Sequence, residues 1–265
     1  MGVRGRLGFR AMPNLKYLRP KTVDEALEQL ASGVPLGGGT TLTPRRFQLE
    51  TVIDLQDLGL SDLEEAGGKV TAGAACTLQQ IVEAEGMVAP QLAEACRREA
   101  AWNLRNMATI AGAVLACDGR SPLASALLAV GAKALLTPGE ETLGLDDLLD
   151  RRPLDPEVLV IGFTWKTKAS LRYEQVARTP ADRPIVAAAV GRPDGSAYRV
   201  VLAGYGARPI RVTRAEKALG AGDPAAAGKA AAAAYANAGD ALAGAAYRSH
   251  VAGVLVRRLG VEGLG

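Results

Sequence analysis

The chain has 265 residues and a formal net charge of +3, with one histidine, three cysteines and 4% aromatic residues. One imidazole cannot build a metal site from several histidines, and any Ser-His-Asp triad would have to use His250. Three well-separated cysteines without a C-x-x-C pair exclude a four-thiolate zinc or iron–sulfur site within this chain. Arginine is scattered rather than clustered, which gives no support for nucleic-acid binding.

The distribution of apolar residues indicates a soluble chain. The longest uncharged apolar stretch begins near Pro122 and ends before Lys133, which is shorter than the roughly 20 residues of a membrane span. Residues 1–11 are basic and lack the apolar core of a secretory signal. Because the cysteines suggest no disulfide framework, we expect a cytoplasmic protein, with residues 1–11 as an N-terminal extension.

The first part of the chain, residues 12–66, alternates helical and extended patterns. Thr22 and Glu25 have the spacing of a capping box, and Gly33 follows the helix that they start. Strands are predicted on either side of a glycine-rich turn, over residues 34–36 and 51–55. This pattern predicts a small α/β unit.

A second α/β unit is expected over residues 67–167. One helix is predicted after the Thr77–Gln80 capping box, another from Pro90, and a buried one over residues 123–130. Residues 104–115 are polar at first and then small, which favours a loop. The remaining predicted elements are strands over 70–74, 132–137 and 158–164 and a short helix over 143–149.

The pattern changes over residues 168–265, where strands precede helices. An Asp194-Gly195 turn predicts a hairpin between the second and third strands. The predicted elements are strands over 171–176, 185–190, 197–202 and 208–212 and helices over 224–238 and 247–259. Strands followed by helices are typical of an α+β domain.

Two glycine- and alanine-rich segments could approach a ligand closely. Gly37, Gly38 and Gly39, followed by Thr40 and Thr41, offer N–H groups and hydroxyls that can donate to a phosphate. Three glycines are equally compatible with a tight turn. In Leu104–Ala113 small residues would admit a flat ligand, but periodicity alone favours a packed loop. Residues 173–178 are compatible with an exposed edge strand.

Five segments, taken in order, carry a resemblance that none carries alone. They are Tyr17–Leu27, Gly37–Pro44, Arg105–Ala113, Leu202–Arg211 and Tyr247–Arg258. The second is similar to a flavin motif that usually reads A-G-G-[HT]-[SD]-L-x-P, and the third to R-N-x-G-T-I-G-G-N. From residue 12 onward the chain resembles the FAD-binding medium subunit of the carbon monoxide dehydrogenase and xanthine dehydrogenase family of molybdenum hydroxylases.

This resemblance implies an α+β architecture in which two small α/β subdomains hold FAD and a C-terminal α+β domain closes over it. In the family, this subunit takes electrons from an iron–sulfur small subunit, which is supplied by a molybdopterin large subunit. The resemblance implies no catalytic acid or base and no metal in this chain. The cofactor-binding residues that it implies are Gly37, Gly38, Gly39, Thr40, Thr41, Leu42, Ala108, Thr109, Gly112, Ala113 and Asp118.

Some positions depart from the family pattern. Ala108 and Ala111 stand where the family usually has glycine, and a positive φ at either would cost about 1–2 kcal/mol. Ala113 replaces a usual Asn or Ser, and Pro122 replaces an Asp that often contacts the cofactor. Asp118 could replace that Asp if the loop is rearranged. These departures leave two alternatives open: a divergent member that has lost FAD and serves as a structural or assembly subunit, and a stand-alone flavin oxidoreductase, which the C-terminal signatures disfavour.

Overall fold

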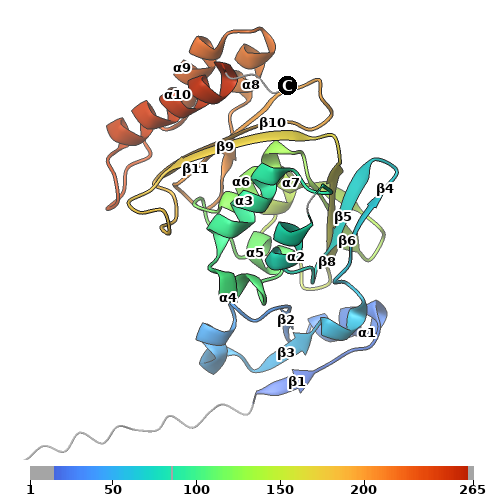
Figure 1. Ribbon diagram of the computed structural model, residues 1–265. Helices are drawn as coiled ribbons and strands as arrows, with labels where there is room; N and C mark the ends of the chain where they lie inside the picture. The colour runs from blue at the N-terminus through green and yellow to red at the C-terminus, as the bar shows by residue number, and fades with distance from the viewer. Residues whose placement is uncertain (1–14, 85, 262–265) are drawn as a thin grey trace, which may run out of the picture.

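The structure is a computed structural model that describes residues 15–84 and 86–261, so the predicted extension over residues 1–11 lies outside the described residues. Three units follow one another along the long axis of the molecule (Figure 1). They are a small N-terminal subdomain, a central subdomain and a C-terminal domain. This mixed α+β architecture is the one that the sequence predicts.

The N-terminal subdomain is a three-stranded parallel sheet in the order β1-β3-β2. Its elements are β1 (Lys16–Leu18), α1 (Val23–Leu30), β2 (Val34–Leu36), β3 (Thr51–Asp54) and the 3-10 helices η1 (Thr43–Gln48) and η2 (Gln56–Leu58). Thr22 caps α1 by accepting from the Glu25 N–H at 3.2 Å. The Glu25 carboxylate accepts from the Lys21 N–H instead of the Thr22 N–H, so only half of the predicted capping box forms.

The central subdomain is a five-stranded antiparallel sheet in the order β4-β5-β8-β6-β7. Its strands are β4 (Leu63–Ala66), β5 (Lys69–Gly73), β6 (Lys133–Thr137), β7 (Thr142–Gly144) and β8 (Leu159–Lys166). Its helices are α2 (Leu78–Glu83), α3 (Pro90–Glu99), α4 (Trp102–Arg105), α5 (Ile110–Leu115), α6 (Pro122–Ala129) and α7 (Leu145–Asp150). Because β4 pairs with β5, we propose the subdomain boundary before Leu63 rather than between residues 66 and 67.

Two predictions for this subdomain were wrong. Residues 104–115 are not a loop, because α4 ends and α5 begins within them. Thr109 starts α5 by accepting from the Gly112 N–H at 3.2 Å, a cap that the small residues of this segment concealed. The predicted helix over 143–149 begins two residues later, since residues 142–144 pair with β6 as strand β7.

The C-terminal domain is an antiparallel sheet in the order β12-β11-β10-β9, covered by three helices. Its elements are β9 (Ser170–Val176), β10 (Val186–Arg192), β11 (Arg199–Ala203), β12 (Ile210–Arg211), α8 (Thr213–Gly220), α9 (Pro224–Ala234) and α10 (Ala245–Val261). The predicted β10–β11 hairpin is confirmed, and β9 is an edge strand as expected. Helix α8 was not predicted.

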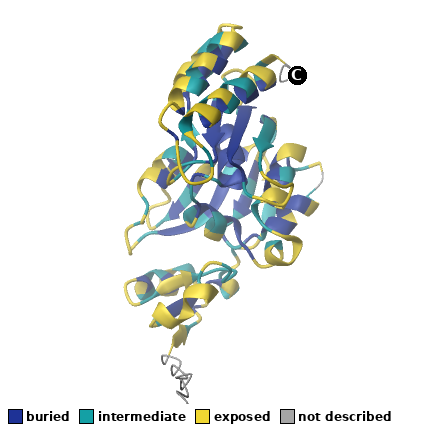
Figure 2. Cartoon of the chain, turned by 90° about the vertical axis from the view of Figure 1, so that its left-hand side faces the viewer, coloured by how far each residue is buried: buried dark blue, intermediate teal, exposed yellow. Residues whose placement is uncertain are grey.

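The sheet of the C-terminal domain is buried on both faces, as the dark strands in Figure 2 show. Ala189 and Val201 pack with the core of the central subdomain, which includes α6. Ala188 and Val190, on the opposite face of the same strand, pack under α8, α9 and α10. The sheet therefore lies between the helix bundle and the core of the central subdomain.

Two negative findings apply to the described part of the chain. Within residues 15–84 and 86–261, every helix is too short or too polar to cross a bilayer. In the same residues no three His, Cys, Asp or Glu side chains are grouped closely enough to hold a metal ion.

Candidate cofactor site

The glycine loop of the N-terminal subdomain lies directly against the second predicted loop. A Cβ built on Gly38 would lie 1.5 Å from the Met107 carbonyl oxygen, and one on Gly37 would lie 2.8 Å from Thr109 Oγ1. Gly39 has φ +70°, which a residue with a side chain rarely adopts. The fold therefore brings the two segments together and requires glycine where they meet.

A run of backbone donors in this loop has no protein acceptor. Leu36 completes the pairing of β2, since its carbonyl accepts from the Leu55 N–H at 3.0 Å. From Gly37 to Leu42, the backbone N–H groups donate to nothing among the described residues. The Thr43 N–H then bonds to Gly39 O at 2.8 Å and starts η1. Consecutive free N–H groups around a left-handed glycine form a concave anion site, which fits the pyrophosphate of FAD.

Most backbone N–H groups of the second loop bond within the chain, and the Thr109 N–H is the exception, with no acceptor among the described residues. Ile110 and Ala111 donate to the carbonyls of Cys76 and Ala74, and Gly112 donates to the Thr109 hydroxyl. This segment can therefore contact a cofactor through its side-chain surface more readily than through its backbone.

Neither Ala108 nor Ala111 has the positive φ at which a side chain would be strained. Within the described residues, Glu140 alone combines a side chain with a positive φ. Ala111 lies inside α5, and Ala108 lies just before the cap. The backbone of these positions therefore tolerates a Cβ, and the two substitutions carry no left-handed strain.

A cavity of about 250 Å³ joins the two loops to the C-terminal domain. Of the predicted residues it contains Thr40, Thr41, Ala108 and Ala113 in its wall. Its other lining residues are Leu78, Glu99, Ala100, Leu104, Ala116, Cys117 and Arg183. Sequence reasoning missed Glu99 and Arg183, because only the tertiary fold places α3 and the β9–β10 loop at this wall.

Asp118 lies beside this cavity and is held by Arg183. Its two carboxylate oxygens accept from the two terminal nitrogens of Arg183 at 2.7 and 3.0 Å. Oδ1 also accepts from the Arg120 N–H at 2.8 Å. Because both carboxylate oxygens of Asp118 are bound to Arg183, any contact between Asp118 and a cofactor would also involve Arg183.

Pro122, the residue that replaces the family's Asp, is buried at the first turn of α6. A carboxylate nevertheless reaches that turn, because Glu99 Oε2 accepts from the Ser121 hydroxyl at 2.7 Å and the Leu123 N–H at 3.0 Å. Burial raises the pKa of Glu99, while these two hydrogen bonds act in the opposite direction. The acidic group at the start of α6 thus comes from α3 rather than from position 122.

The three cysteines are buried thiols. Burial raises the pKa of Cys76 to about 12 and that of Cys117 to about 11, and it raises that of Cys96 further. A thiol with so high a pKa is a poor nucleophile and metal ligand at neutral pH.

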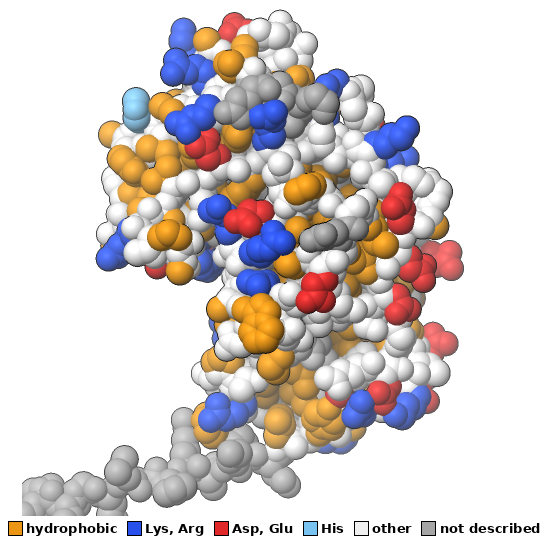
Figure 3. All heavy atoms as spheres, in the orientation of Figure 1, with side chains coloured by type: hydrophobic (Ala, Val, Ile, Leu, Met, Phe, Trp, Pro, Cys, Tyr) orange, Lys and Arg blue, Asp and Glu red, His pale blue; other side chains and the backbone are white. Residues whose placement is uncertain are grey.

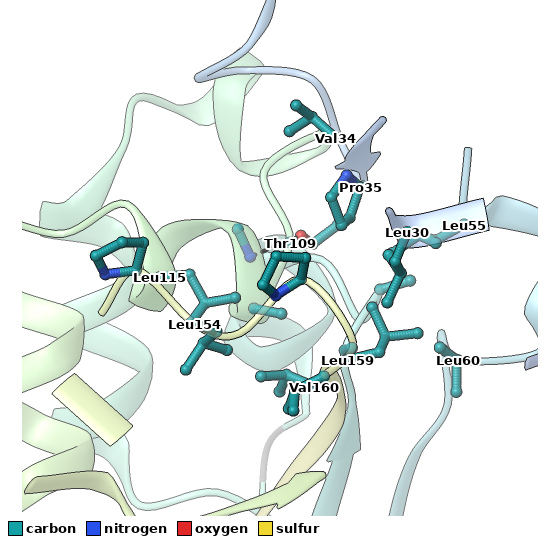
Figure 4. A pocket seen from close by; sticks show the side chains of 18 of the residues that line it. Leu30, Val34, Pro35, Leu55, Leu60, Thr109, Leu115, Leu154, Leu159 and Val160 are labelled. Carbon is teal, nitrogen blue, oxygen red and sulfur yellow. Dashed lines mark hydrogen bonds between the residues drawn. The ribbon is translucent and has the colours of Figure 1, made fainter. Parts of the chain in front are cut away.

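A larger cavity of about 490 Å³ lies on the other side of the glycine loop (Figure 4). Leu30, Val34 and Pro35 face Leu159 and Val160 across it. Thr109, Gly37 and Gly112 contribute to its wall as well. Seven of the predicted residues thus line one or other of these two cavities, and Gly38, Gly39, Leu42 and Asp118 line neither. Of the two cavities, the smaller one reaches the C-terminal domain.

The outer surface near the smaller cavity carries exposed apolar side chains. Figure 3 shows an inward step in the outline between the C-terminal domain and the N-terminal subdomain, with hydrophobic side chains at its edge. Trp102, Leu104 and Met107, in α4 and the turn after it, are exposed by 68%, 44% and 56%.

Comparison with known proteins decides the family. Residues 12–164 match the model of the FAD binding domain in molybdopterin dehydrogenase. The chain belongs to this family. The family carries FAD, the cofactor that the sequence resemblance implies. The chain is also 31% identical over 210 residues to the uncharacterized protein YgfM of Escherichia coli K12, which covers 76% of this chain and 79% of YgfM.

Solved structures extend the match to nearly the whole chain of this FAD-binding family member. Carbon monoxide dehydrogenase from Hydrogenophaga pseudoflava superimposes with a TM-score of 0.82 and 25% identity, over 93% of this chain and 96% of that one. Carbon monoxide dehydrogenase from Oligotropha carboxidovorans gives a TM-score of 0.78 and 26% identity over the same shares. Quinoline 2-oxidoreductase from Pseudomonas putida 86, at 19% identity and a TM-score of 0.82, shows the shared fold.

Proposed function

We propose that this chain is the FAD-binding subunit of a molybdenum hydroxylase complex, passing electrons from the iron–sulfur clusters of a small subunit to an external acceptor. A molybdopterin large subunit would carry the substrate site. The observation that carries the proposal is the run of free N–H groups from Gly37 to Leu42, held against the second flavin segment. Family membership and the carbon monoxide dehydrogenase likeness support it.

Each part of the site has a role in holding FAD. The N–H groups of the glycine loop, with the hydroxyls of Thr40 and Thr41, donate to the pyrophosphate. Ala108 and Ala113 give the cavity a wall of small side chains against which a flat ring can lie. Thr109 and Gly112 hold the second loop in place through the cap of α5.

Bound FAD supplies the redox chemistry, and the chain supplies orientation and access. The proposal assigns no proton transfer to a side chain of this subunit. In this proposal the iron–sulfur centres belong to the partner chain, because three well-separated cysteines cannot supply the four thiolates of a cluster.

Titration of the purified chain with FAD tests the proposal, followed by flavin absorbance and by quenching of flavin fluorescence. We expect saturable binding at micromolar FAD. Gly38→Ala should weaken it by at least about tenfold, because the new Cβ collides with the Met107 carbonyl and separates the two loops. Gly220→Ala is the matched control, since a Cβ there meets nothing within 4 Å.

Failure of the unmodified chain to bind FAD would contradict the proposal. In that case the alternative of a cofactor-free structural or assembly subunit stands. It predicts that the chain still forms a complex with its partner subunits when no FAD is present. Copurification of tagged chain with those subunits, under flavin depletion, measures this.

A further inference from the structure

Arg183 is the cationic side chain in the wall of the smaller cavity, and three contacts fix its position. Its side chain is bound by both oxygens of Asp118. Its backbone carbonyl accepts from Arg120 Nη2 at 2.9 Å, and the next carbonyl, of Pro184, accepts from Arg120 Nε at 3.0 Å. Asp118 and Arg120 belong to one loop of the central subdomain. This loop therefore holds Arg183 from both its side chain and its main chain.

The guanidinium retains capacity for another anion. Asp118 occupies one hydrogen on each terminal nitrogen, and the remaining N–H groups have no acceptor among the described residues. The Arg183 side chain is 41% exposed, so these groups are accessible. An arginine held in place by one carboxylate loses little further freedom when it binds a second anion.

The other charges around the cavity do not provide this function. Glu99 and Asp118 are acidic, and Arg120 does not line the cavity, since its guanidinium donates to the carbonyls of Arg183 and Pro184. Arg183 shares the cavity wall with Thr40 and Thr41, which follow the free N–H run of the glycine loop. A cofactor bound to that loop therefore enters a cavity whose available positive charge is Arg183.

We propose that Arg183 contacts the anionic part of the bound flavin cofactor and that Asp118 positions it for this contact. The inference rests on the proposed FAD-binding function. Two parts of FAD share the required chemistry: the pyrophosphate, which is always negative, and the ring, which gains negative charge on reduction. Arg183 stabilises the pyrophosphate or the reduced ring, depending on which lies against it. The two contacts lead to different expected results for an Arg183 variant.

The experiment compares Arg183→Gln with the unmodified chain. Contact with the pyrophosphate predicts that FAD affinity falls by at least about tenfold while riboflavin affinity is unchanged, as on losing a hydrogen bond to a charged group. Contact with the ring predicts an unchanged affinity for oxidised FAD and a midpoint potential that is more negative. A tenfold loss of preference for the reduced form corresponds to a shift of about 30 mV for two electrons.

Two further variants control for charge and folding. Arg178→Gln removes the same charge from the same β9–β10 loop at an exposed position outside the cavity wall, and it should change neither quantity. Arg183→Lys keeps the positive charge but loses the two parallel N–H groups of the guanidinium. It should therefore lose less FAD affinity, or shift the midpoint potential less, than Arg183→Gln. The inference is overturned if Arg183→Gln has the same FAD affinity and the same midpoint potential as the unmodified chain. Failure of the unmodified chain to bind FAD overturns the proposed function and this inference together.

Discussion

At the scale of single residues, backbone conformation decides what a departure from the family pattern means. Ala108 and Ala111 replace glycines, yet neither has a positive φ, so their methyl groups are accommodated. Gly38 differs from them, because its Cα lies against the Met107 carbonyl and leaves no room for a methyl group. The same exchange of glycine and alanine is thus tolerated at one loop and excluded at the other.

Glu99 gives the clearest pH dependence. Because its pKa in the folded chain is raised, the folded state retains its proton at pH values where the unfolded state has lost it. Stability from this group is therefore lost as the pH rises from the ordinary value of glutamate through the raised value. Glu99→Gln does not titrate and still offers an oxygen to Ser121 and Leu123. We expect it to match the parent at acidic pH and to exceed it in stability at neutral pH.

Urea unfolding between pH 4 and pH 8 measures this difference. Glu94→Gln on the same helix is the control, since Glu94 is a surface partner of Arg97 and Arg98. It should change stability by less than about 1 kcal/mol and leave the pH profile unaltered. A Glu99→Gln variant whose stability follows the parent across the whole range would contradict the assignment.

At the scale of elements, the short helix α5 explains how the second flavin segment acquires its shape. The segment is too rich in small residues to show helical periodicity, but its cap, Thr109, accepts from the Gly112 N–H. The same threonine contacts the glycine loop, where a Cβ on Gly37 would meet its hydroxyl. The helix cap and the junction of the two loops therefore depend on one side chain.

Thr109→Ala should consequently have two effects. We expect a loss of about 1 kcal/mol in the free energy of unfolding, as for other helix caps. FAD affinity should also fall, because the junction with the glycine loop loosens. Thr109→Ser should restore both.

Thr22→Ala is the matched control, since Thr22 caps α1 in the same way but does not line either cavity. Thr22→Ala should lower the free energy of unfolding as Thr109→Ala does, but it should leave FAD affinity unchanged. Equal FAD affinities in the two alanine variants would argue against the role of Thr109 at the junction. Urea unfolding and FAD titration provide the two readouts.

At the scale of the whole molecule, the C-terminal signature attaches its domain to the central subdomain. Arg211 pairs with Asp146 at 2.6 Å and Arg208 with Asp150 at 2.6 Å, both acids lying on α7. The Gly204 N–H donates to the Gly119 carbonyl at 2.6 Å, next to Asp118. The segment that resembles the family's C-terminal domain is thus also the segment that positions the cavity wall.

Within the C-terminal domain itself, Arg248 joins α10 to the ends of the sheet strands and to the loop before α10. It is fully buried and donates to the carbonyls of Ile185 and Gly204 and to Asp240. Arg248→Met leaves Asp240 and two carbonyls without their cation. We expect a loss of about 2–5 kcal/mol in the free energy of unfolding, because the two buried carbonyls lose their donor at about 1–3 kcal/mol each, whereas Asp240 is exposed to water.

Arg214→Met is the control for Arg248→Met, since Arg214 is exposed on α8 and should change stability by no more than about 0.5 kcal/mol. Thermal and urea unfolding of both variants measure the difference. If Arg248→Met were as stable as Arg214→Met, the buried arginine would not be what holds the domain in place.

The sequence was sufficient to predict most elements and the order of the three units, because capping residues and apolar patterns are local signals. It predicted α1, α2 and the β10–β11 hairpin from Thr22, Thr77 and the Asp194-Gly195 turn. It failed at α5 and β7, where small residues or tertiary pairing outweigh local preference, and it also missed β1, β4, α4 and α8. Its list of site residues remains a set of proposals for cofactor contact.

By itself, the sequence determined the family, the cofactor and the glycine loop. The family and the cofactor follow from five motifs in a fixed order, and the loop follows from glycine, the residue type that permits close approach. Only the tertiary structure could decide which charged groups reach the cavity. Arg183 is far from the flavin motifs in the chain, Glu99 ends the helix that precedes the second motif, and α3 and the β9–β10 loop bring the two side chains to the same wall. Side chains gathered by packing from separate elements leave no spacing that a sequence could reveal.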